Sequence, residues 1–277
     1  MGATEQAALV AQFLTGKTTL RTALTEWVRR WFAATPSFRD ADADRYVAEV
    51  LPVALGAQQS MASLSWAFQA RMLTDITGDP TPPALVTAER VTGRSLRGVD
   101  PAIVYRRPFT QIYTELARGK SMTEAVTAGQ LRAQQIAVTD LQLTDMRTAH
   151  VVLDGDPRAP QFFRRVLTGN ENCGLCILAS TQRYHRGELA AIHPGCDCGV
   201  APLPDDVDPG QVIDEDLLTA AHDAIAERFG QADAGGRAPD YRKVVLVREH
   251  GELGPVLTVT DHRFTGPDQI PAAGQSS

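Results

Sequence analysis

The sequence predicts a mainly α-helical protein: an elongated helical N-terminal domain, then a small zinc-stapled α+β module with a terminal β-hairpin. Two observations predict this fold. Apolar residues recur at helical spacing through residues 1–151, and little there resembles a strand. All four cysteines lie between positions 173 and 198, in a spacing typical of a metal site. We therefore expect three parts: a helical docking domain (1–151), a Cys-rich zinc module (152–207), and an amphipathic helix with hairpin and frayed tail (208–277).

Five helices are expected in the first 151 residues. Their apolar spacing and end signals place them at Thr4–Leu14, Leu20–Ala34, Asp40–Ile76, Pro108–Leu116 and from Ser121 to about His150. The last one begins at a capping box, Ser121-x-x-Glu124, in which the serine oxygen accepts an N–H bond and the glutamate reaches back to the cap.

The segment Gly16-Lys17-Thr18-Thr19 resembles the end of a phosphate-binding loop. Position 11 is alanine where that loop needs glycine, and no strand precedes it. We interpret Gly16 as a helix C-cap, which would end the first helix near this point.

The C-terminal half has predicted strands as well as a predicted helix. Val212–Phe229 has the apolar spacing of an amphipathic helix. Val244–Val247 and Val256–Val259 read as the two strands of a β-hairpin.

The cysteines form two close pairs. Cys173 and Cys176 make a C-x2-C pair, and Cys196 and Cys198 follow His193 in the sequence His-Pro-Gly-Cys-Asp-Cys. Two pairs that flank one loop can bring four thiolates around a tetrahedral zinc ion. The residues leave three alternatives open: two disulfides, unligated thiols in a packed hairpin, and His193 as a ligand in place of one sulfur. Softer thiolate donors favour the all-cysteine site, with His193 as a hydrogen-bond partner of a ligand.

Charge and hydropathy narrow the functional classes. Residues 1–151 carry 16 Lys/Arg against 14 Asp/Glu, whereas residues 152–277 carry 11 against 19. An acidic C-terminal half argues against a sequence-independent grip on nucleic-acid phosphates. No stretch approaches the roughly 20 apolar residues of a membrane span. We expect no signal peptide, and therefore reduced thiols in a cytosolic environment.

The sequence identifies no catalytic residue. It has no G-x-S-x-G elbow and no H-E-x-x-H motif. His150 could pair with a distant serine, and Ser180 lies near His185, within the Cys-rich loop. Three more serines, Ser60, Ser63 and Ser65, lie on a predicted helix, where a serine usually faces solvent or bonds the preceding turn.

One family resemblance goes beyond these general patterns. The stretches Val166–Cys176 (VLTGNENCGLC), Ser180–Tyr184 (STQRY) and Ile192–Cys198 (IHPGCDC) resemble the phage Mu F-like (MuF) minor head proteins, in the form found in phages of actinobacteria. The stretch Gly235–Lys243 (GGRAPDYRK) and the segments around Arg248 and Gly254 are also similar to that branch.

The resemblance implies a minor capsid protein inside the head of a tailed phage, associated with the portal and active in head morphogenesis. Its implied partners are the portal protein and the major capsid or scaffold protein, with packaged DNA as a further candidate and no membrane. Copies would be arranged around the portal, after assembly in the host cytoplasm. Such proteins are often labelled capsid maturation proteases, so proteolysis of capsid or scaffold protein is the alternative function.

Overall fold

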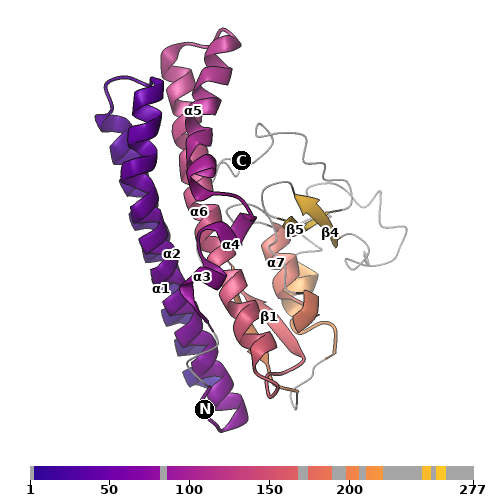
Figure 1. Ribbon diagram of the computed structural model, residues 1–277. Helices are drawn as coiled ribbons and strands as arrows, with labels where there is room; N and C mark the ends of the chain where they lie inside the picture. The colour runs from indigo at the N-terminus through magenta and orange to yellow at the C-terminus, as the bar shows by residue number, and fades with distance from the viewer. Residues whose placement is uncertain are drawn as a thin grey trace, which may run out of the picture.

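The protein is described from a computed structural model that covers residues 3–81, 86–167, 174–188, 198–205, 210–220, 245–250 and 254–259. It is mainly helical, as predicted. Four helices form a bundle in which successive long helices run in opposite directions (Figure 1). They are α1 (Ala3–Ala34), α2 (Asp40–Thr77), α5 (Pro101–Ala117) and α6 (Met122–Gly155).

Local signals set the helix ends. The predicted capping box opens α6, because the Glu124 N–H donates to Ser121 Oγ and the Ser121 N–H donates to the Glu124 carboxylate. α5 begins seven residues before the predicted start. There the Asp100 side chain accepts a 2.9 Å hydrogen bond from the Ala102 N–H, and Pro101 occupies the first helical position. α2 ends at Gly78, whose φ of 77° suits glycine.

The interpretation of Gly16 as a helix C-cap is wrong. α1 continues through this position to Ala34. A Cβ added at Gly16 would lie 2.8 Å from Leu64 Cδ2 of α2. The glycine therefore allows α1 and α2 to approach closely and does not end the helix.

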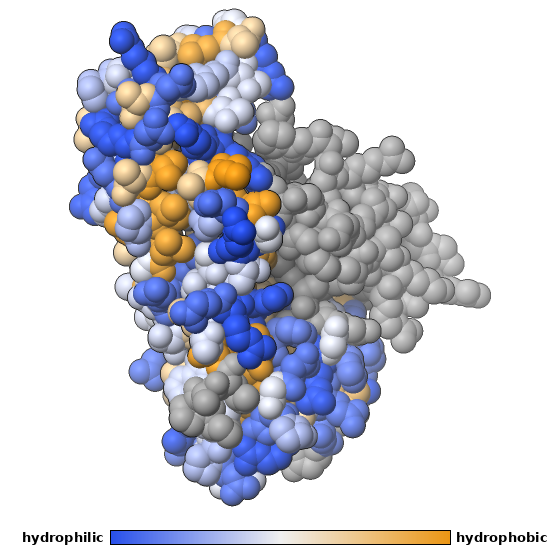
Figure 2. All heavy atoms as spheres, viewed as in Figure 1, coloured by the Kyte–Doolittle hydropathy of each residue, from blue (hydrophilic) through white to orange (hydrophobic). Residues whose placement is uncertain are grey.

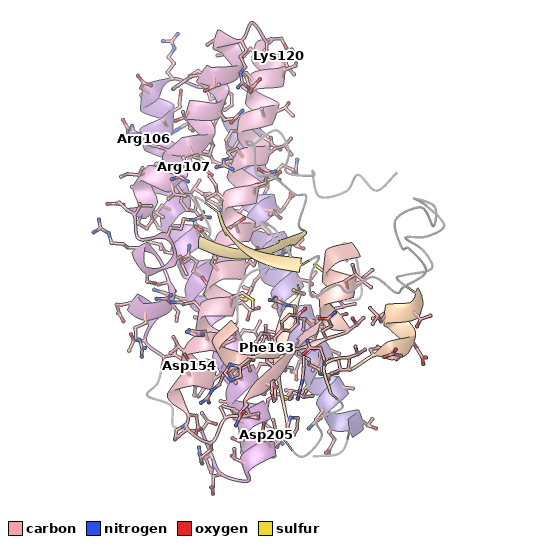
Figure 3. The ribbon with its side chains drawn as sticks, turned by 90° about the vertical axis from the view of Figure 1, so that its right-hand side faces the viewer. Arg106, Arg107, Lys120, Asp154, Phe163 and Asp205 are labelled. Atoms are coloured by element: carbon pink, nitrogen blue, oxygen red, sulfur yellow. The ribbon has the colours of Figure 1, made fainter. Side chains whose placement is uncertain are left out.

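One half of the bundle, which we call the distal half, has a core rich in aromatic residues. It lies toward the α1–α2 and α5–α6 turns, and Figure 3 places Lys120 at its end and Arg106 and Arg107 along α5. Trp31 and Tyr46 pack edge to face with ring centroids 4.8 Å apart, and Phe109 lies 5.8 Å from Tyr46. The other buried large residues there include Leu24, Val28, Phe32, Val50, Met61, Val104, Tyr105, Ile112, Ile136 and Leu141.

The other half, the module half, is completed by a sheet where α5 does not reach. The strands β2 (Arg183–His185), β1 (Phe162–Val166) and β3 (Gly199–Leu203) form an antiparallel sheet in the order β2-β1-β3. Phe163, labelled in Figure 3, packs against Leu73 of α2 and Met146, Ala149 and Val152 of α6. On the other face, Val166 and Ala201 pack against Phe13, Leu14 and Phe68. Module and helices therefore share one core.

Two short helices cross the middle of the bundle, α3 (Ala88–Val91) and α4 (Arg94–Arg97). Arg97 of α4 is ion-paired with Asp140 of α6, with Nη2 2.7 Å from Oδ1 and both side chains buried. The Gln58 amide links α2 to this pair at 3.3 Å and accepts the Gly93 N–H at 2.8 Å. These bonds hold Gly93 and α4 against α2 and α6.

The remaining elements follow the Cys-rich region. They are α7 (Gly174–Ser180), a single 3-10 turn (Arg186–Glu188), and the hairpin strands β4 (Val245–His250) and β5 (Gly254–Val259). The hairpin was predicted and is confirmed, with longer strands than expected. Of the predicted helix Val212–Phe229, residues 215–220 are helical, and its second half lies outside the described residues. No helix in the described ranges has the length and hydropathy to cross a membrane.

Candidate functional site

Two of the five predicted metal ligands lie within the described residues, both in the module half. Cys176 is in α7 and Cys198 directly precedes β3, and their exposed fractions are 1% and 3%. Cys173, His193 and Cys196 lie outside the described residues. Within the described ranges, no three His, Cys, Asp or Glu residues form a group that could hold a metal ion. The ligand set therefore stays a prediction, and the surroundings of Cys198 are what the structure can test.

Two buried cations from different elements hold Cys198. Lys17 of α1 donates from Nζ to the Cys198 carbonyl oxygen at 2.9 Å. Arg165 of β1 donates from Nη1 to the Cys198 sulfur at 3.8 Å. Lys17 and Arg165 are each 2% exposed. The main chain and the sulfur of this residue are thus both fixed before any ligand is considered.

The chemistry of this contact fits a metal–thiolate centre. A guanidinium buried in the protein needs anionic or aromatic neighbours, because burial removes its hydration. Arg165 lies over the Tyr184 ring, 5.3 Å from its centroid, in addition to the Cys198 sulfur. Burial raises the pKa of Tyr184, and the charge of Arg165 offsets part of that rise. A cation next to a cysteine sulfur favours the thiolate, which is the form in which cysteine binds metals.

Lys17 also belongs to a buried network that joins three helices. Its Nζ lies 2.5 Å from Asp145 Oδ2 of α6, and Ser65 of α2 donates to Asp145 Oδ1 at 2.7 Å. The carboxylate is therefore satisfied on both oxygens. Because Lys17 also bonds Cys198, the network connects α1, α2 and α6 to the main chain of the Cys-rich module.

Further hydrogen bonds join the module to the helices. Gln69 of α2 donates from Nε2 to the Val200 carbonyl of β3 at 2.7 Å, and Gln69 is fully buried. Arg186 donates from Nη1 to the carbonyls of Leu153 and Ala159, each at 3.3 Å. The module is thus held by specific polar contacts as well as by the shared apolar core.

The serines predicted to be structural behave in two ways. Ser60 and Ser63 bond the carbonyls of Gly56 and Gln59 in the preceding turn, as expected for helical serines. Ser65, in contrast, is fully buried against Asp145. A serine, a carboxylate and a lysine in contact are the components of a hydrolytic site, but a peptide substrate needs access to the hydroxyl. Burial removes that access, so this trio is structural.

The histidines make other contacts. The His150 Nε2 lies 3.3 Å from Asp154 Oδ2 within α6, and His185 Nδ1 accepts the Gly187 N–H at 3.2 Å. Ser180 donates to the Ile177 carbonyl at 2.8 Å and not to His185. Across the described ranges, no serine or threonine hydroxyl bonds a histidine ring.

Sequence reasoning missed Lys17, Asp145 and Arg165. Lys17 and Arg165 had a detectable signal, since each charge interrupts an otherwise apolar face. Lys17 continues the α1 stripe of Phe13, Leu24 and Val28, and Arg165 follows Phe163 on the inward face of β1.

Comparisons with known proteins add no assignment. No family model, curated protein or solved structure matches this chain.

Proposed function

We propose that this chain is a minor head protein of a tailed phage that acts by binding during head morphogenesis, with one structural zinc ion in its Cys-rich module. The resemblance of residues 166–204 to the MuF minor head proteins supports the head assignment. Cys173, Cys176, Cys196 and Cys198 would hold the zinc, with His193 as the alternative to one sulfur.

The observation that carries the zinc proposal is the double restraint on Cys198. A ligand for a structural metal must be held in place, and here the carbonyl is bonded by Lys17 and the sulfur by Arg165. A zinc ion with four thiolates carries two excess negative charges, so a buried guanidinium beside one sulfur stabilises it. The metal would supply cohesion that short strands cannot provide by themselves.

A binding role is supported by the surface of the helical body. Large apolar side chains are exposed on it: Ile103 at 61%, Met122 at 56%, Leu131 at 44%, Val99 at 39% and Val53 at 37%. Figure 2 shows apolar side chains gathered on this body between hydrophilic ones. Such patches on a soluble surface often mark protein–protein contacts. The proposed partners are the portal protein and the major capsid or scaffold protein.

The test uses the full chain during phage assembly. Wild type, Cys198→Ser and a distal surface variant, Ile103→Asp, are each supplied to a phage that lacks its own copy, and purified heads are analysed by mass spectrometry. We expect wild type in the heads, with Ile103→Asp depleted although its zinc content is unchanged. The proposed function is wrong if wild type is absent from heads.

The same heads test the protease alternative. A binding role predicts that capsid and scaffold proteins have the same termini whether the chain carries wild-type His150 or His150→Ala. Uncut subunits in heads that contain a normally packaged His150→Ala chain would establish proteolysis and overturn the binding role.

A further inference from the structure

A groove of about 660 Å³ lies between α1 and the face of the sheet that carries Arg164 and Val166. Its walls are one side of α1 from Ala7 to Thr19, the end of β1 from Arg164 to Leu167, Ser180 at the end of α7, and Asp214 with Leu217. The α1 wall is about 18 Å long at 1.5 Å per residue, which matches an extended peptide of about five residues. The lining mixes apolar side chains with hydroxyl groups.

Arg164 brings an uncompensated positive charge to this groove. It is half-buried, and burial lowers its pKa. In the described ranges no hydrogen bond or ion pair engages its guanidinium. Arg165, its neighbour along the strand, faces the opposite side and is engaged by Tyr184 and Cys198.

A second arginine, Arg183, lies on the same face of the sheet as Arg164. Arg164 is paired directly with Arg183 of β2 in the antiparallel register. Directly opposite residues share one face of a sheet, and like charges in such a pair are destabilising. The Arg183 guanidinium lies 3.9 Å from the centroid of the Phe162 ring, a contact that keeps it on this face.

The groove contains one acidic side chain among its described lining residues, Asp214. Its Oδ1 accepts the Leu217 N–H at 2.9 Å and so caps the helical residues 215–220. Asp214 keeps its negative charge, but it is not ion-paired with Arg164, whose pKa is shifted by burial alone.

We propose that this groove binds an extended acidic peptide segment of a partner protein, with a carboxylate on Arg164 and an adjacent apolar side chain against Val10 and Leu14. The positive charge of Arg164 favours an acidic residue in the peptide. The apolar part of the lining favours an apolar residue next to it. A nucleic acid fits less well, because single-stranded binding uses aromatic stacking platforms and rows of cations, and the described lining has no aromatic residue. The proposal does not depend on zinc or on the head assignment.

The test is a selection of random pentapeptides on the full-length protein, with wild type, Arg164→Gln and a control variant, Arg29→Gln, in parallel. Arg29 is an exposed α1 arginine paired with Glu26, three positions away on the helix. We expect wild type and Arg29→Gln to enrich peptides with Asp or Glu beside an apolar residue, and Arg164→Gln to lose that enrichment.

Single peptides then give the magnitude. A selected peptide should bind wild type about tenfold or more tightly than its Asp→Asn or Glu→Gln version, as for a charge-assisted hydrogen bond. Arg164→Lys should recover part of the loss. The proposal is overturned if no acidic peptides are enriched, if Arg164→Gln selects the same set, or if an oligothymidylate binds the groove and the peptides do not. Thermal melting of each variant verifies that it is folded.

Discussion

The cores of the two halves of the bundle are built from different kinds of residues. In the distal half four helices meet around Trp31, Tyr46 and Phe109, and the core is mainly apolar, with one buried ion pair, Arg97–Asp140, where it meets the middle of the bundle. In the module half the sheet replaces α5, and the core contains the Lys17–Asp145 pair and Arg165. Apolar contacts are non-directional, whereas a buried charge accepts only a matched partner. The distal half therefore packs mainly through non-directional contacts, whereas the charged contacts of the module half fix the position of Cys198.

The largest expected effect comes from breaking one partner of the buried pair. Asp145→Leu leaves the Lys17 ammonium buried beside only a carbonyl, and should lower the free energy of unfolding by about 3–5 kcal/mol. The double variant Lys17→Met/Asp145→Leu should recover most of that loss, because no buried charge remains. Urea unfolding of the single and double variants measures the coupling. Additive losses in the cycle would contradict a matched pair.

Phe109→Ala should cost about as much, 3–5 kcal/mol, because it opens a cavity in the aromatic core. The two variants should differ in their metal content. This variant should keep its metal content in the folded protein, whereas Asp145→Leu should lower it, since Lys17 also positions Cys198. Elemental analysis of both variants at a temperature where they are folded makes the comparison. Equal metal loss in the two would remove the distinction between the halves.

Arg165 offers a more selective change. If its guanidinium stabilises the Cys198 thiolate, Arg165→Met should weaken zinc binding by about 10–100-fold, the effect typical of residues that support metal ligands. Arg165→Lys keeps the positive charge, so its zinc affinity should lie between those of wild type and Arg165→Met. Competition with a chromophoric chelator gives the affinities. Unchanged affinity in Arg165→Met would assign the arginine a packing role only.

Two helical glycines, Gly129 and Gly56, differ in the space available for a Cβ atom. A Cβ at Gly129 would lie 2.4 Å from Ile112 Cγ1 and 2.9 Å from the Pro108 carbonyl oxygen, whereas at Gly56 it would meet nothing within 4 Å. Gly129→Ala should therefore destabilise by about 1–3 kcal/mol through overpacking. Gly56→Ala should stabilise by about 0.5–1 kcal/mol through helix propensity. The shift in melting temperature of each variant measures the effect. A stabilising Gly129→Ala would show that α5 and α6 are not packed this closely.

The smallest change at neutral pH is expected for Tyr46→Phe. The Tyr46 hydroxyl is buried and, among the described residues, has no hydrogen-bond partner, so its removal should be neutral or slightly stabilising. Burial raises the pKa of Tyr46, and also that of Tyr105. A raised pKa in the folded state gives stability that is complete below the unfolded value of about 10 and is lost as pH rises above it. Tyr46→Phe should reduce this alkaline loss in urea unfolding measured between pH 8 and 11. The same loss in both proteins would show that Tyr46 does not contribute to it.

Much of the helical fold could be predicted because its signals are local. Ser121 and Glu124 mark the start of α6, and the Val245–Val259 hairpin follows from two short valine-rich runs joined by a short polar turn. Gly16 was misinterpreted because the sequence does not distinguish a glycine that ends a helix from a glycine that lets two helices approach closely. The apolar stripe that runs from Phe13 to Val28 across Gly16 was the better indicator of one continuous helix.

The site was less predictable because its partners are distant in sequence. The cysteine spacing predicts the ligand set, and the structure buries Cys176 and Cys198. Nothing near Cys198 in the sequence identifies Lys17, which lies 181 residues away. A charge on an apolar stripe shows that a buried partner exists, but only the tertiary fold determines which residue it is.

X-ray absorption at the zinc edge of the full-length protein, purified without chelator, tests the central claim most directly. The account predicts about one zinc ion per chain, bound by four sulfurs at about 2.3 Å. Three sulfurs and one nitrogen would assign His193 in place of one cysteine. A protein with no stoichiometric zinc and four freely titrating thiols would contradict the account.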